Sequence, residues 1–132
     1  MFMPYIIGGV LSVVVAVAMR TIGFDRDRAF YPTVLIIVGS YYVLFAAMAG
    51  STQTLLLELV PMTAFVIAAI AGFKLSAWIV AAGLAGHGLF DALHGYILDN
   101  PGMPVWWPAF CGAYDIGAAV CLAWLLYRDS ST

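Results

Sequence analysis

Long apolar runs, separated by short polar breaks, occupy almost the whole chain. No charged side chain occurs between Ala29 and Leu57. A membrane-spanning helix needs about 20 largely apolar residues, and hydrocarbon favours helices because they hydrogen-bond their own backbone. Five segments have this length: residues 4–22, 32–50, 52–73, 75–98 and 107–127. We therefore predict an all-α fold, a polytopic membrane protein whose single domain, residues 1–132, is a five-transmembrane-helix bundle.

The composition agrees with a membrane protein. Of the 132 residues, 64% are hydrophobic and 9% are charged, against about 25% charged residues in a typical soluble domain. The net charge is −2 and no basic run occurs, so we expect no nucleic-acid partner. The first apolar run follows no basic segment and is itself followed by Arg20, so we expect no cleaved signal peptide.

The positions of the basic residues predict the orientation. The predicted loops are too short for anything but antiparallel neighbours, and all five Lys and Arg then fall at one end of the bundle: Arg20, Arg26, Arg28, Lys74 and Arg128. The positive-inside rule places this end in the cytoplasm and the N-terminus outside. We expect a multi-pass protein of a bacterial inner membrane. We interpret the loop of residues 25–28 as a determinant of topology, with a lipid-phosphate site as the alternative.

Small residues recur at four-residue spacing, for example Gly8, Ser12 and Ala16. Such spacing lets the backbones of membrane helices approach closely. We expect ordinary helix packing from it, with homo-oligomer contacts as a further possibility.

The segment Gly86-His-Gly-Leu-Phe-Asp-Ala-Leu-His-Gly95 places ionisable groups inside a predicted span. His87, Asp91 and His94 lie at positions i, i+4 and i+7, so at about 100° per residue they share one narrow stripe of a helix. Ionisable side chains are costly in a membrane and indicate a functional site by default. The alternative is that they stabilise the bundle through interhelical hydrogen bonds.

Two further carboxylates are predicted at a similar depth. At about 1.5 Å per residue, Asp115 lies roughly 12 Å and Glu58 roughly 8 or 9 Å below the outer ends of their helices. No Lys or Arg occurs at that depth to neutralise them, which favours a metal or a proton site. Cys111 and Cys121 are about 15 Å apart along one helix, out of disulfide reach, and we interpret both as small apolar residues, with a minor chance that Cys111 joins the site.

The first hypothesis is an intramembrane metal site with His87, Asp91, His94 and Asp115 as ligands. Imidazole and carboxylate groups suit a divalent transition metal such as Zn²⁺, Fe²⁺, Mn²⁺ or Cu²⁺. Used catalytically, the metal would activate water or oxygen, with Glu58, Asp91 and Asp115 as the candidate catalytic carboxylates. The substrate would be a lipid-like molecule that enters from the bilayer.

Two other hypotheses use the same side chains. One is a proton- or cation-coupled transporter or channel that relays protons through them. The other is a non-catalytic membrane subunit whose polar stripe holds a partner helix or a haem, with His87 or His94 as an axial ligand.

The combination Gly86-His-Gly-x-x-Asp-x-x-His-Gly95, Asn100-Pro-Gly-x-Pro104 and Trp106-Trp-Pro-x-Phe-Cys-x-x-Tyr-Asp115 resembles a group of small bacterial integral membrane proteins. The resemblance covers mainly the C-terminal third and implies no activity. The His/Asp stripe is also similar to copper and zinc sites of membrane monooxygenase subunits and ceramidase-type hydrolases. The chain lacks the seven-helix plan of the ceramidases and the repeated histidine boxes of desaturases, so this second likeness is an analogy only.

Overall fold

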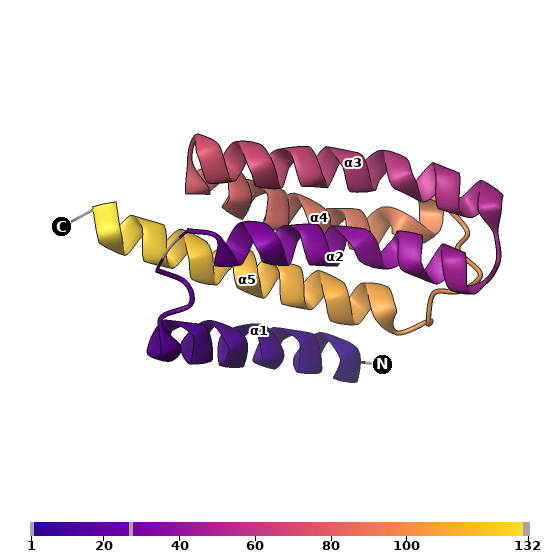
Figure 1. The fold of residues 1–132 in the computed structure, drawn as a ribbon. Helices are drawn as coiled ribbons and strands as arrows, with labels where there is room; N and C mark the ends of the chain where they lie inside the picture. Colours follow the sequence, from indigo (N-terminus) through magenta and orange to yellow (C-terminus); the bar gives the residue numbers. More distant parts are fainter. Residues whose placement is uncertain (1, 27, 131–132) are drawn as a thin grey trace.

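The structure is a computed structural model that describes residues 2–26 and 28–130, and this part of the chain is all-helical (Figure 1). The helices are α1 (Met3–Ile22), α2 (Phe30–Met48), α3 (Thr52–Lys74), α4 (Ala77–Ile97) and α5 (Trp107–Ser130). Their bounds agree with the predicted segments to within a few residues.

Local capping explains several helix ends. The Ser51 and Ser76 hydroxyls accept hydrogen bonds from the backbone N–H groups of Thr54 and Trp78 and so begin α3 and α4. Gly23 ends α1 with φ 96°, a left-handed conformation that favours glycine, and its N–H donates to the Met19 carbonyl. Three of the four breaks between helices therefore follow from the residues at that point.

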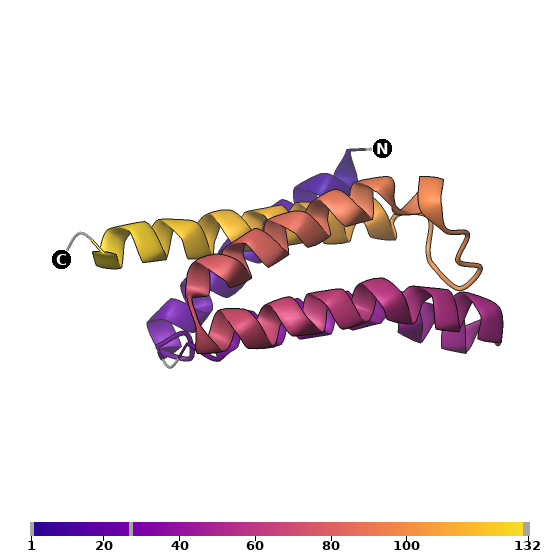
Figure 2. The ribbon, with the colours of Figure 1, turned by 90° about the horizontal axis from the view of Figure 1, so that it is seen from above.

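The helices form two layers with one helix outside them. α2 and α3 pack together on one side, and α4 and α5 pack together on the other (Figures 1 and 2). α4 contacts α2, α3 and α5, whereas α1 contacts only α5 among the described helices. Consecutive helices run antiparallel, so the α1–α2 and α3–α4 connections and the C-terminus lie at one end of the bundle (Figure 1). We call this the basic end, because it carries Arg20, Arg26, Arg28, Lys74 and Arg128.

The hydrophobic core lies toward the basic end, between α2, α4 and α5. Leu35, Val80 and Leu84 are fully buried there. The remaining core members are Tyr31, Val34, Val38, Ala69, Ala81, Cys111, Ala118, Ala119 and Leu122. Because apolar side chains fill this region, the buried ionisable side chains of α3, α4 and α5, namely Glu58, His87, Asp91, His94 and Asp115, lie in the other half of the bundle.

Four of the described helices are long and apolar enough to cross a membrane, namely α1, α2, α3 and α5. The 21-residue α4 is not among them. Its three ionisable side chains, His87, Asp91 and His94, lower its mean hydropathy, and all three are buried against the other helices. The protein is thus a membrane-type helical bundle in which the ionisable side chains of α4 are enclosed by the other helices.

Candidate metal centre

Two glycines allow α4 and α5 to approach closely beside the polar residues. A Cβ atom added to Gly88 would lie 2.7 Å from Ile116 Cδ1 and 3.2 Å from the Gly112 carbonyl oxygen. A Cβ atom added to Gly112 would lie 3.4 Å from the Asp91 Cβ. The close approach places the Asp91 side chain of α4 within reach of α5.

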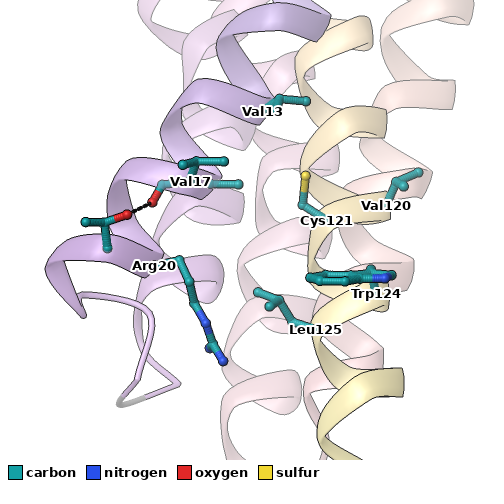
Figure 3. Close-up of a pocket in the computed structure, with 9 residues that line it drawn as sticks. Val13, Val17, Arg20, Val120, Cys121, Trp124 and Leu125 are labelled. Carbon is teal, nitrogen blue, oxygen red and sulfur yellow. Dashed lines mark hydrogen bonds between the residues drawn. The ribbon is translucent and has the colours of Figure 1, made fainter.

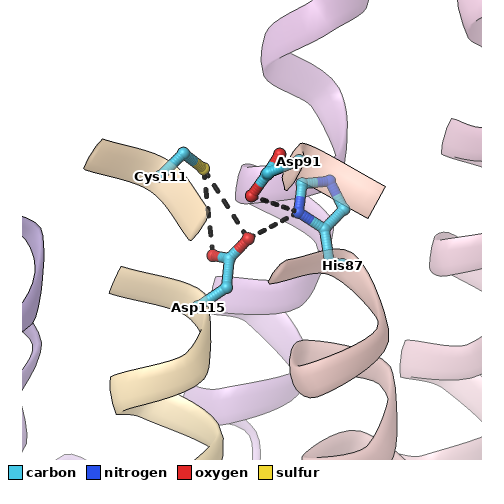
Figure 4. A group of neighbouring side chains, drawn as sticks. All are labelled: His87, Asp91, Cys111 and Asp115. Carbon is cyan, nitrogen blue, oxygen red and sulfur yellow. Dashed lines mark hydrogen bonds and ion pairs between the residues drawn. The ribbon is translucent and has the colours of Figure 1, made fainter. Parts of the chain in front are cut away.

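Four side chains from these two helices form a buried group that could hold a metal ion. His87 and Asp91 come from α4, and Cys111 and Asp115 come from α5 (Figure 4). One potential ligand atom from each residue lies within 4.8 Å of the others. We call this set the metal cluster.

The contacts inside the metal cluster are short. His87 Nδ1 lies 2.6 Å from Asp115 Oδ2 and 3.4 Å from Asp91 Oδ2. The Cys111 thiol lies 3.7 Å and 3.9 Å from the two oxygens of Asp115. Figure 4 shows the imidazole, the two carboxylates and the sulfur converging on one point.

Charge and burial make the metal cluster unusual. Each of its four residues is at most 2% exposed. The ion pairs found in the described residues join Asp91 and Asp115 to His87, and none joins them to Lys or Arg. Two carboxylates and one imidazole therefore share a buried site with too few positive charges, and a dication or bound protons would supply the balance.

Tyr42 of α2 connects the metal cluster to a second polar group. Its hydroxyl donates a 2.6 Å hydrogen bond to Asp91 Oδ1. Its ring stacks on the imidazole of His94 with centroids 3.9 Å apart and planes 8° from parallel. The Tyr42 side chain is 1% exposed, so it is held on both faces by polar residues of α4.

The second group contains Glu58, His94 and Asn100. His94 Nε2 lies 2.6 Å from Glu58 Oε2, and Asn100 Nδ2 donates to the same oxygen at 2.9 Å and to the Tyr42 carbonyl at 2.8 Å. Asn100 belongs to the connection between α4 and α5, whose Gly102 N–H donates back to Asn100 Oδ1. We call Glu58 and His94 the acid–histidine pair. A carboxylate and a protonated imidazole have no net charge together, so this pair needs no further cation.

Some buried polar atoms in both groups lack a hydrogen-bond partner within the described residues. They are Glu58 Oε1, His87 Nε2, Asp91 Oδ2 and His94 Nδ1. A buried polar atom without a hydrogen-bond partner destabilises the fold. An ion or a water molecule bound to these four atoms would remove this cost.

The five site residues predicted from the sequence are all buried in one half of the bundle, but they divide into two sets. His87, Asp91 and Asp115 meet in the metal cluster, whereas His94 and Glu58 face each other outside it. Cys111, to which the sequence reasoning gave only a minor chance, is the fourth member of the cluster. The signal that could have found it is its position one helical turn before Asp115, on the same face of the helix.

No family model, curated protein or solved structure matches this chain.

Proposed function

We propose that this protein is an integral membrane protein that binds one divalent transition metal at His87, Asp91, Cys111 and Asp115. The observation that supports it best is the convergence of four potential ligand atoms within 4.8 Å in a fully buried position. A dication would balance the two carboxylates, which have no Lys or Arg partner within the described residues. A metal-bound Cys111 would lose its proton, so the site with all four ligands would carry one net negative charge.

The donor set favours particular metals. One imidazole, two carboxylates and one thiolate are all ligands that Zn²⁺ accepts in four-coordinate sites. A thiolate also suits Cu and Fe, whereas Mn²⁺ prefers carboxylate, carbonyl and water oxygens. We therefore rank Zn²⁺ first among Zn²⁺, Fe²⁺, Mn²⁺ and Cu²⁺.

The membrane topology belongs to the same proposal. All five helices cross the bilayer, with α4 admitted because its polar face is covered by α2, α3 and α5. The basic end faces the cytoplasm under the positive-inside rule, which places the metal cluster in the outer half of a bacterial inner membrane.

A catalytic role on a hydrophobic substrate is the extension we favour. A cavity of about 270 Å³ between α1, α2 and α5 is lined by apolar and aromatic side chains and reaches Cys111. It would admit a lipid-like molecule laterally from the bilayer. In a catalytic site one of the two carboxylates, Asp91 or Asp115, would leave its coordination position to water and serve as the general base, while Glu58 acts at a distance through the acid–histidine pair.

Metal analysis of purified protein tests the metal site. Wild-type protein in detergent is expected to hold about one metal per chain, and His87→Ala and Asp91→Ala are expected to hold none. Cys111→Ser is expected to bind more weakly. His94→Ala serves as the matched control, because it removes a buried imidazole from α4 that lies outside the metal cluster.

The outcomes separate the possibilities. Folded wild-type protein that neither contains nor takes up metal contradicts the proposal. Loss of metal in a folded His94→Ala variant would instead assign the ligands to the helical stripe of His87, Asp91 and His94. An optical spectrum of the same samples decides the haem alternative, because a haem protein is coloured.

Proton-coupled transport is the second candidate. It is favoured by the polar contacts that lead from Asp115 through His87 and Asp91 to the Tyr42 hydroxyl. Proton flux into proteoliposomes tests this candidate. A flux that falls with Asp91→Asn supports a proton relay, and a flux that this substitution leaves unchanged contradicts it.

A further inference from the structure

A buried acidic side chain lies at the basic end, far along the bundle from the metal cluster. The Asp25 side chain, in the connection between α1 and α2, is 1% exposed, and its closest ionic partner is Arg20 at 3.8 Å. Both of its carboxylate oxygens and the nearby Tyr31 hydroxyl lack a hydrogen-bond partner in the part of the chain that the structure describes. Buried oxygens of this kind require a donor.

Asp25 and Tyr31 line a cavity that is also lined by cationic side chains. The cavity, of about 240 Å³, is lined by Asp25 and Tyr31 together with Arg20, Arg26 and Arg28. Asp129 lines it as well, so neither sign of charge dominates. A ligand that fits must offer both an anionic group for the guanidinium groups and a cationic hydrogen-bond donor for the carboxylate.

An apolar groove continues from this cavity along the outside of the bundle. It has a volume of about 360 Å³, runs between α1 and α5, and shares Arg20 and Leu125 with the charged cavity (Figure 3). Figure 3 shows Val13 and Val17 of α1 directed toward α5, where Cys121 lies opposite them. The groove lies on helices that are apolar enough to span a membrane.

We propose that the charged cavity and the apolar groove together bind one phospholipid whose headgroup carries a primary ammonium group. The lipid phosphate is held by Arg20, Arg26 and Arg28, since guanidinium groups bind phosphate oxygens well. The ammonium group donates to Asp25 and Tyr31. One acyl chain occupies the groove between α1 and α5.

The headgroup assignment follows from hydrogen-bond donors. The ammonium of phosphatidylethanolamine carries N–H donors, whereas the trimethylated nitrogen of phosphatidylcholine carries none. Phosphatidylglycerol offers hydroxyl donors but no cation to balance Asp25. This proposal uses none of the metal-cluster residues, so a result that contradicts the metal site does not affect it.

Native mass spectrometry of the detergent-purified protein tests which headgroup is preferred. The protein is titrated separately with phosphatidylethanolamine, phosphatidylcholine and phosphatidylglycerol of identical acyl chains. Phosphatidylethanolamine is expected to bind about tenfold more tightly than phosphatidylcholine, the effect of one charge-assisted hydrogen bond. Asp25→Asn is expected to abolish this preference, and Asp99→Asn, an exposed carboxylate in the α4–α5 connection, is expected to retain it.

Equal binding of phosphatidylethanolamine and phosphatidylcholine by the wild type, or tighter binding of phosphatidylglycerol, would overturn the assignment. Because this comparison uses the wild type, it decides the question even where Asp25→Asn fails to fold.

A matched pair of tryptophan substitutions tests the groove. Val17 lines it and Val14 does not, although both are exposed valines of α1. Val17→Trp is expected to reduce binding of all three lipids by about tenfold or more, and Val14→Trp is expected to leave it unchanged. Equal effects of the two substitutions would show that the acyl chain lies elsewhere.

Discussion

At the scale of single residues, Tyr42 holds the two polar groups in one arrangement. Its hydroxyl donates to Asp91, its ring stacks on His94, and its carbonyl accepts from Asn100. A single residue of α2 thus contacts two side chains of α4 through its side chain and the α4–α5 connection through its backbone. Removing one of these contacts separates its contribution from the others.

Tyr42→Phe keeps the ring and deletes only the hydroxyl. It leaves Asp91 Oδ1 buried without its donor, so we expect a loss of about 1–2 kcal/mol in the free energy of unfolding and weaker metal binding. The free energy of unfolding is measured by titration with a denaturing detergent, with circular dichroism as the signal. Tyr41→Phe is the control, since Tyr41 lies next in α2 but contacts Phe45 and Trp107. Equal stability of the two variants would contradict this role.

The acid–histidine pair gives a second prediction at this scale. Glu58→Gln keeps the size of the side chain but removes the charge that faces His94 across 2.6 Å. We expect a loss of about 1–3 kcal/mol in the free energy of unfolding, with metal content unchanged because neither residue belongs to the metal cluster. Metal loss in this variant would place Glu58 in the metal site.

The division of the site into two groups follows from helix geometry that the stripe pattern alone does not express. Positions i and i+7 share a face but lie about 10 Å apart along the axis, and His94 turns to Glu58 of α3 at 2.6 Å, whereas His87 turns to Asp115 of α5. The sequence therefore predicted the face correctly but not the grouping. The pairing of His94 with Glu58 depends on how α3 packs on α4, which no local pattern contains.

At the scale of elements, the helices were predictable and their contacts were not. Apolar run length and the capping residues Ser51 and Ser76 define where helices begin and end. The approach of α4 to α5 depends instead on Gly88 and Gly112, two of the 13 glycines in the chain. Which glycines lie at a helix contact is a property of the tertiary structure.

Two glycines of α4 give a matched test of this contact. A Cβ atom at Gly88 would meet Ile116 at 2.7 Å, whereas one at Gly95 has nothing within 4 Å. We expect Gly88→Ala to destabilise the protein by about 1–3 kcal/mol through overpacking and to lower metal affinity. Gly95→Ala should be neutral or stabilising by up to about 1 kcal/mol, because alanine favours helix. Thermal unfolding with metal analysis measures both, and a reversed order would contradict the packing.

At the scale of the whole molecule, the proposed orientation makes the two ends of the bundle chemically distinguishable. Ser51 lies between α2 and α3 at one end, and Lys74 ends α3 at the basic end. In a variant without Cys111 and Cys121, we expect Ser51→Cys to react with an impermeant thiol reagent in intact cells. Lys74→Cys should react only after permeabilisation. The opposite pattern would invert the topology and place the metal cluster in the inner half of the membrane.

The isolation of α1 has a consequence for biogenesis. Its only described helix contact is α5, which is synthesised after the other four described helices. During translation α1 therefore lies in the bilayer without its partner helix until about 80 further residues have been made. The metal cluster also needs residues of α5, so the packing of α1 and the assembly of the cluster depend on the same late step.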